Sequence, residues 1–70
     1  MNKKKLQVLG MSCQHCVNRV TKIINGFDGV SNAEVSLEGK EATFHYDPLK
    51  IDIRSIINAI VDAGYQASEL

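Results

Sequence analysis

Two cysteines separated by two residues carry the most evident chemistry of this chain. Cys13 and Cys16 lie in the stretch Gly10-Met11-Ser12-Cys13-Gln14-His15-Cys16 and are the only cysteines among the 70 residues. A short apolar segment precedes them and an amphipathic helical pattern follows, so we expect Cys16 at the start of a helix. Backbone N–H groups and the helix dipole lower a thiol pKa at that place and favour the thiolate. Two thiolates with no third ligand nearby in sequence favour a soft ion, with copper(I) as the leading candidate.

The same cysteine pair is also compatible with thiol–disulfide exchange. Thioredoxin-like proteins are longer, and they commonly carry an aromatic residue before their cysteines and a proline between them. This chain has no tryptophan, and its single proline, Pro48, falls in a predicted turn well beyond the cysteines. The sequence therefore favours metal binding over redox catalysis, and we expect a binding protein rather than an enzyme.

Length and composition predict one small domain that spans residues 1–70. An apolar fraction of 44% is enough for a core that needs no metal or disulfide for support. Eight basic residues balance eight acidic ones, so nothing points to a nucleic-acid partner. The one run of like charge, Lys3-Lys4-Lys5, is short and is expected to form a frayed, solvated terminus.

No segment is long and apolar enough to cross a bilayer, and we expect no direct membrane insertion. The basic and then apolar start lacks the apolar length and the small-residue cleavage site of a signal peptide. We therefore expect the cytoplasm, where thiols stay reduced. The initial Met1 and a final predicted strand favour a whole protein, and an excised domain is the alternative.

Apolar periodicity predicts six elements in the order βαββαβ. The predicted strands cover residues 6–9, 30–37, 42–46 and 65–70, and the predicted helices cover 16–27 and 53–61, with Ser12 or Cys13 as the first N-cap. This order is typical of a ferredoxin-like α+β sandwich, in which two helices cover one face of a four-stranded antiparallel sheet of order 4-1-3-2. In that topology the cysteine loop and the Gly64-Tyr65 turn are neighbours at one end.

The stretch from Gly10 to Cys16 resembles the G-M-[ST]-C-x-x-C loop of heavy-metal-associated (HMA) domains. Asp28-Gly29-Val30, Tyr46-Asp47-Pro48 and Gly64-Tyr65 also fall where that family has similar residues. The resemblance covers essentially the whole chain, and in length and in the position of Tyr65 it is greatest to bacterial copper chaperones of the CopZ type. One departure is the apolar Leu9, where the family pattern has a polar residue.

The resemblance implies that Cys13 and Cys16 bind copper(I) and deliver it to the metal-binding domain of a copper-transporting P-type ATPase. The resemblance is also compatible with a copper-loaded homodimer. Two alternatives keep the same site chemistry: a metal-binding domain of a P-type ATPase, or a carrier for mercury, zinc or cadmium. Zinc and cadmium domains of this family often carry an acidic residue near the cysteines, whereas Ser12 adds no carboxylate here and so favours copper.

Four residues near the cysteines have a structural and a functional interpretation. Met11 is either a thioether ligand or a core residue that holds the loop, and we favour the core. His15 is expected to face solvent, where a partly protonated ring would stabilise the thiolates. Tyr65 is either a core aromatic or a group that shields the metal, with its hydroxyl near a sulfur. Ser12 completes the predicted surroundings of the site.

Three further side chains are expected on the surface. Arg19 and Lys22 lie three residues apart on the first predicted helix, where they form a solvated face or steer docking to an acidic partner. His45 is expected to be exposed on the open side of the sheet.

Overall fold

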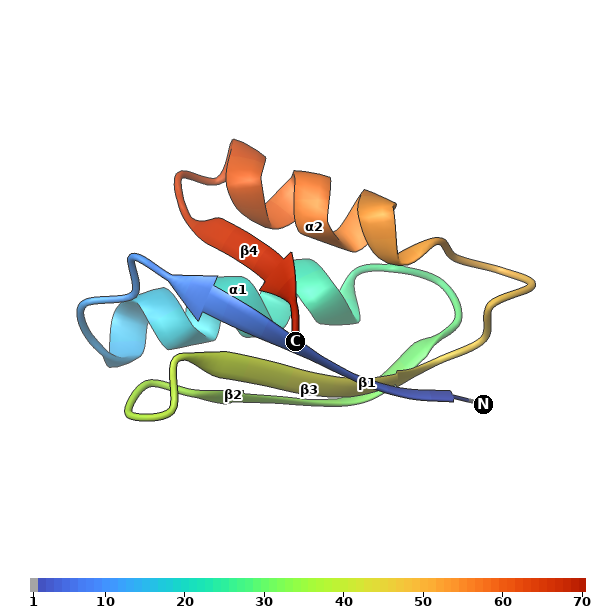
Figure 1. Ribbon diagram of the computed structural model, residues 1–70, viewed down its shortest axis with the longest axis horizontal. Helices are drawn as coiled ribbons and strands as arrows, with labels where there is room; N and C mark the ends of the chain where they lie inside the picture. The colour runs from blue at the N-terminus through green and yellow to red at the C-terminus, as the bar shows by residue number, and fades with distance from the viewer. Residues whose placement is uncertain (1) are drawn as a thin grey trace.

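The structure is a computed structural model that describes residues 2–70, and its six elements follow the predicted order. They are β1 (Asn2–Leu9), α1 (Gln14–Asn25), β2 (Val30–Ser36), β3 (Glu41–Tyr46), α2 (Ile53–Asp62) and β4 (Gln66–Glu69). The strands form one antiparallel sheet in the order β2-β3-β1-β4, which confirms the predicted topology. Both helices lie on the same face of this sheet (Figure 1). Over residues 2–70, no helix is long and apolar enough to span a membrane.

The core lies between the sheet and the two helices, and it explains why both periodicities occur in the sequence. Alternate residues of the central strands and every third or fourth residue of each helix turn inward, as the pleat and the helical pitch require. The buried cluster comprises Leu6, Val8, Val20, Ile24, Ala42, Phe44, Ile56, Ile60 and Tyr65. Cys13 is not among these residues, so the apolar core is complete without a metal in the loop.

The lysine run near the N-terminus is part of β1, and the expectation of a frayed terminus is wrong. The β1 backbone pairs with β3 from Asn2 opposite Tyr46 to Gln7 opposite Glu41, so the strand begins earlier than its apolar residues indicate. Two lysines also form ion pairs. Lys4 Nζ lies 2.7 Å from Glu69 Oε1, and Lys5 Nζ lies 3.7 Å from Glu41 Oε1. Backbone pairing to a neighbouring strand therefore outweighs the polarity of the side chains.

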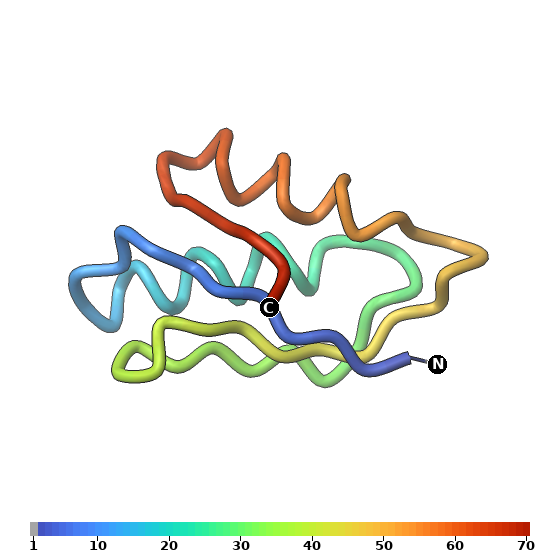
Figure 2. The backbone as a smooth tube through the Cα atoms, viewed as in Figure 1, coloured from blue at the N-terminus to red at the C-terminus, as the bar shows by residue number. Residues whose placement is uncertain are grey.

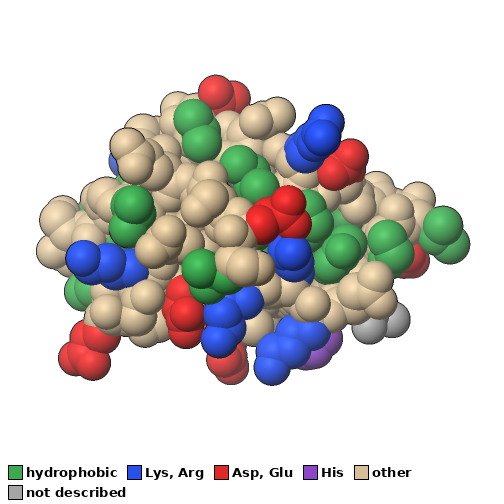
Figure 3. Space-filling view, viewed as in Figure 1, with side chains coloured by type: hydrophobic (Ala, Val, Ile, Leu, Met, Phe, Trp, Pro, Cys, Tyr) green, Lys and Arg blue, Asp and Glu red, His purple; other side chains and the backbone are tan. Residues whose placement is uncertain are grey.

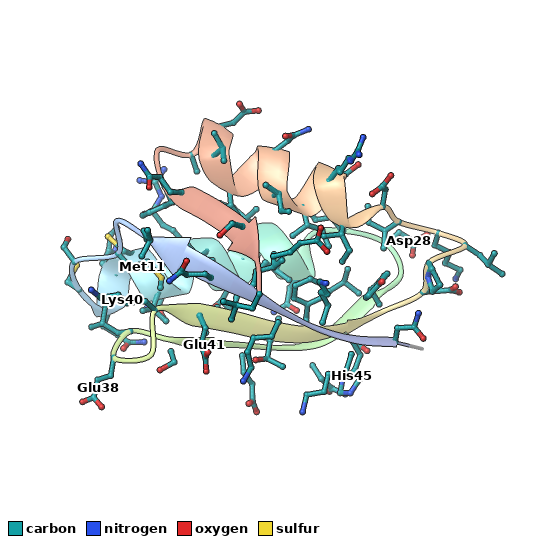
Figure 4. All side chains as sticks on the ribbon, in the orientation of Figure 1. Met11, Asp28, Glu38, Lys40, Glu41 and His45 are labelled. Atoms are coloured by element: carbon teal, nitrogen blue, oxygen red, sulfur yellow. The ribbon has the colours of Figure 1, made fainter. Side chains whose placement is uncertain are left out.

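The edge strand β2 contains a β-bulge that the alternation of its residues does not predict. The register between β2 and β3 shifts between Ser31 and Glu34, and Asn32 adopts a positive φ of 55°. Such a bulge bends the edge strand. The Asn32 Nδ2 atom lies 3.4 Å from His45 Nδ1. His45 is on the open face as predicted, half-buried rather than fully exposed, and it points away from the helices (Figure 4).

Three turns meet at one end of the molecule. They are the β1–α1 loop, the β2–β3 turn and the α2–β4 turn, which Figure 2 shows at the same end of the trace. The Val8 N–H donates to the Lys40 carbonyl at 2.8 Å and so holds the β2–β3 turn beside the end of β1. Met11 and Lys40 lie at this end, whereas Asp28 lies at the opposite one (Figure 4). The predicted meeting of the cysteine loop with the Gly64-Tyr65 turn is confirmed.

Candidate metal centre

Cys13 is the residue that starts helix α1. Its backbone is extended, with φ −161° and ψ 173°, and its carbonyl accepts the N–H groups of Cys16 at 3.0 Å and Val17 at 3.3 Å. Its side chain makes no capping hydrogen bond, so the thiol is not used to stabilise the helix. Of the two N-cap candidates in the sequence, Cys13 is the one the structure selects. The result is an exposed, free thiol at the helix N-terminus.

Cys16 lies in the first turn of α1, two residues after the helix begins at Gln14. It is half-buried and packs against the edge of the core cluster. The Ser12 backbone N–H donates to its sulfur and is the main reason why the pKa of Cys16 is lowered from 9.0 to about 6. Hydrogen bonds from the Tyr65 and Ser12 hydroxyls lower this pKa further, with Ser12 Oγ 3.8 Å from Cys16 Sγ. Burial opposes these effects, and the hydrogen bonds prevail, so the thiolate dominates at neutral pH.

Tyr65 is a core aromatic whose hydroxyl also lies near a cysteine sulfur, whereas shielding of a metal by its ring stays a prediction. Its side chain is 8% exposed and belongs to the core cluster. Its hydroxyl reaches the Cys16 sulfur, and this hydrogen bond is the main cause that raises the pKa of Tyr65. Burial adds to the rise, whereas the positive charge of Arg19 acts against it. The ring of Tyr65 therefore packs in the apolar core, while its hydroxyl contacts the Cys16 sulfur.

Gly10 adopts a backbone conformation that favours glycine at the point where the cysteine loop passes the α2–β4 turn. Its φ of 98° lies in the region that side chains rarely adopt. A Cβ atom at this position would lie 3.7 Å from both the Cα and the Cδ1 of Tyr65. A side chain at position 10 would therefore be strained by the positive φ rather than by contact with Tyr65, which lies at ordinary van der Waals distance. The motif in the sequence contains this glycine, but it does not identify Tyr65 as the contacting residue.

The remaining candidates occupy different surroundings. Met11 is half-buried and packs against the core, as expected for a residue that holds the loop. His15 is exposed on α1 and faces a hollow on the outer side of that helix, which is lined by His15, Asn18, Arg19, Thr21 and Lys22. Leu9 is half-buried at the end of β1, opposite Gln66 of β4. The proximity of Arg19 to Tyr65 was not apparent from the sequence, because it depends on the packing of α1 against the α2–β4 turn.

The donor set of the site consists of two sulfurs. Within residues 2–70, no group of three or more His, Cys, Asp or Glu side chains is placed to hold a metal ion together. An ion that prefers oxygen or nitrogen ligands in a four- or six-coordinate shell finds too few donors here. A soft ion that accepts two thiolates fits the residues present.

The fold and the two-cysteine loop are those of a small domain that binds a soft metal ion. The family model of the heavy-metal-associated domain matches residues 5–66, and the chain belongs to this family. It is 42% identical over 69 residues to the copper chaperone CopZ of Bacillus subtilis, and the match covers 99% of this chain and 100% of that protein.

Two solved structures share the fold and indicate the range of the family. One is a copper-binding domain from HMA7, a P-type ATPase, with a TM-score of 0.95 and 34% identity over 100% of this chain and 95% of that one. The other is oxidized MerP from Ralstonia metallidurans CH34, with a TM-score of 0.91 and 34% identity over 97% of this chain and 94% of that one. The family relationship is thus supported by sequence and by structure.

Proposed function

We propose that residues 1–70 form a single cytoplasmic carrier domain that binds one copper(I) ion through Cys13 and Cys16 and delivers it to a copper-transporting P-type ATPase. The observation that supports this most directly is the state of Cys16. Hydrogen bonds from Ser12 and Tyr65 lower the pKa of Cys16 to about 6, so a thiolate is available beside the free Cys13 thiol. The similarity to CopZ chaperones supports copper as the cargo.

A two-sulfur site explains how tight binding and transfer can occur together. Copper(I) bound by two thiolates is only two-coordinate. A third sulfur can therefore bind the ion before either of the first two leaves. A first partner thiolate adds to the ion and one carrier cysteine leaves, after which a second partner thiolate displaces the other carrier cysteine. Each partner thiol gives up a proton as it binds, and each released carrier thiolate takes one up. The copper stays in the +1 state throughout, so no oxidant or reductant is consumed. Exposure of Cys13 lets such a partner reach the site.

The outer side of α1 is the proposed docking surface for the partner. Arg19 and Lys22 lie there, and the sequence of this helix contains no aspartate or glutamate. A basic surface beside the site fits an acidic partner domain, because opposite charges speed encounter and orient the two surfaces. Over the sheet, by contrast, basic and acidic side chains are interspersed (Figure 3). The second proposed assembly, a copper-loaded homodimer, would use the same two cysteines, of which Cys13 is exposed.

Two alternatives use the same sulfurs. The chain also resembles the copper-binding domain of a P-type ATPase, for which the site chemistry is the same. The other alternative is a mercury carrier, because two thiolates also suit that soft ion. Zinc and cadmium are less favoured, because the described residues offer no carboxylate or further ligand beside the two sulfurs.

An anaerobic competition titration of the reduced protein with copper(I), zinc(II) and mercury(II) tests the proposal. We expect one copper(I) per chain, and X-ray absorption should show sulfur as the main ligand. The variant Cys13→Ser/Cys16→Ser is the control and should lose copper binding while keeping the fold. A copper site dominated by nitrogen or oxygen, or binding that survives in this double variant, would refute the proposal.

A further inference from the structure

Asn25, the last residue of α1, is the one asparagine of the chain that precedes a glycine. The other four asparagines precede residues with side chains: Asn2, Asn18, Asn32 and Asn58. An asparagine side chain can close a five-membered succinimide ring with the backbone nitrogen of the next residue, and a side chain on that residue hinders the closure. Asn25 and Gly26 are both exposed, and the Asn25 side chain makes no hydrogen bond within residues 2–70. The pair therefore has the chemistry and the exposure for deamidation.

The nitrogen that closes the ring is held by the last turn of α1. The Gly26 N–H donates to the Lys22 carbonyl at 3.0 Å and to the Ile23 carbonyl at 3.3 Å. Gly26 is also close to helical, with φ −73° and ψ −11°. While this N–H donates to the two carbonyls, its nitrogen is not free to attack the side chain of Asn25. The last turn of a helix opens more readily than its middle, so local opening is enough to release the nitrogen.

We propose that Asn25 is a site of spontaneous deamidation and that opening of the last turn of α1 controls its rate. The Gly26 nitrogen bonds to Asn25 Cγ, and its proton leaves with the side-chain amide as ammonia. Water then opens the succinimide ring. Attack of water on the side-chain carbonyl gives aspartate, and attack on the backbone carbonyl gives isoaspartate. One water is consumed and one ammonia is released, with no change of oxidation state.

The product adds a carboxylate to a helix whose sequence contains neither aspartate nor glutamate. Position 25 follows Lys22 by three residues, so the two side chains are neighbours on the helix surface. Lys22 belongs to the proposed docking surface, and an adjacent carboxylate offsets its charge. This consequence rests on the proposed function. The loop after α1 lies at the end of the molecule opposite the cysteine loop, as Asp28 and Met11 show (Figure 4), so copper affinity should not change.

Incubation of the reduced, metal-free protein at mildly alkaline pH, followed by peptide mass spectrometry, tests the inference. We expect aspartate and isoaspartate at position 25 before any change at the other four asparagines, which are internal controls. The reaction should be roughly tenfold slower in the folded chain than in denaturant, the size expected when one hydrogen bond must open first. Because one turn opens locally, the rate should stay nearly constant at low denaturant and rise only as the whole domain unfolds.

Three variants separate the chemistry from its consequence, and circular dichroism verifies that each is folded. Gly26→Ala is compatible with the φ of −73° and should slow the reaction several-fold, because its methyl group hinders ring closure. Asn25→Asp reproduces one product and should slow copper transfer to an acidic domain about two- to threefold at low salt. Asn58→Asp makes the same change of charge on α2 and should leave the transfer rate unchanged.

The outcomes also separate this inference from the proposed function. Reaction at another asparagine before Asn25, or an unmodified Asn25 in the folded protein after the denatured chain has fully reacted, would overturn the inference. Equal rates in the folded and denatured chains would show that the helix end does not control the reaction. A transfer rate of Asn25→Asp equal to that of the wild type would overturn the consequence for docking. The mass measurement involves no metal, so it stands or fails independently of the proposed copper site.

Discussion

The Tyr65 hydroxyl donates a hydrogen bond to the Cys16 sulfur, and this bond joins the α2–β4 turn to the first turn of α1. It is one of three hydrogen bonds from Ser12 and Tyr65 that hold the pKa of Cys16 at about 6. The phenol ring is anchored by the core, so the donor is presented to the sulfur without a large loss of side-chain freedom.

The first prediction concerns this hydrogen bond. Tyr65→Phe should raise the pKa of Cys16 above 6, because one donor to the thiolate is lost while the ring still fills the core. The ultraviolet absorbance of the thiolate, followed against pH, measures the change. Tyr46→Phe removes the hydroxyl of the other tyrosine, which packs against Phe44, and is the matched control. An unchanged titration in Tyr65→Phe would show that this bond does not govern the thiolate.

The second prediction is a pH dependence of stability in the reduced, metal-free protein. The pKa of Cys16 is about 6 in the folded state against an ordinary value of 9.0, so the native state favours the thiolate. This contribution is complete above pH 9, declines as the pH falls, and is lost below about pH 6. Denaturant unfolding of the wild type and of Cys16→Ser across this range measures it. The difference between the two stabilities should shrink towards low pH, and a constant difference would contradict the prediction.

The third prediction is that the fold does not depend on the metal. The buried cluster contains residues of both helices and of β1 and β3, and Cys13 is outside it. The reduced, chelated protein and Cys13→Ser/Cys16→Ser should therefore give the circular dichroism of a folded α+β domain, unlike a zinc finger, which unfolds without its ion. By contrast, Phe44→Ala should cost about 3–5 kcal/mol and unfold much of the population. A random-coil spectrum of the chelated wild type would refute the prediction.

The fourth prediction separates docking from metal binding. Lys22→Glu should slow copper transfer to an acidic ATPase domain about three- to tenfold at low salt, because rim charges act mainly on the rate of encounter. Copper affinity should be unchanged, since Lys22 lies six residues after Cys16 on α1, more than one helical turn from the sulfur. Stopped-flow transfer measures the rate, and Arg54→Glu on α2 is the control. Equal rates for Lys22→Glu and the wild type would remove this part of α1 from the docking surface.

Local patterns in the sequence were sufficient for the type and order of the elements. Periods of two and of three to four residues are produced directly by the pleat and the helical pitch, so these periods alone assign the core faces of β3 and α2. The turn glycines and the cysteine loop were also local signals. The polar start of β1 was missed, because its pairing depends on β3, which comes much later in the chain.

Local sequence patterns predicted only part of the chemistry of the candidate metal site. A few adjacent residues suffice to place two thiols at a helix N-terminus, so that feature could be predicted from the sequence. The folded chain decided between alternatives that the sequence left open: Cys13 rather than Ser12 caps α1, and the Tyr65 hydroxyl is hydrogen-bonded to Cys16. The charge of Arg19 on Tyr65 was not expected from the sequence. Tyr65 reaches the Cys16 sulfur because α1 and the α2–β4 turn pack against the same sheet. Hydrogen bonds and charges between distant segments depend on that packing, which no local pattern records.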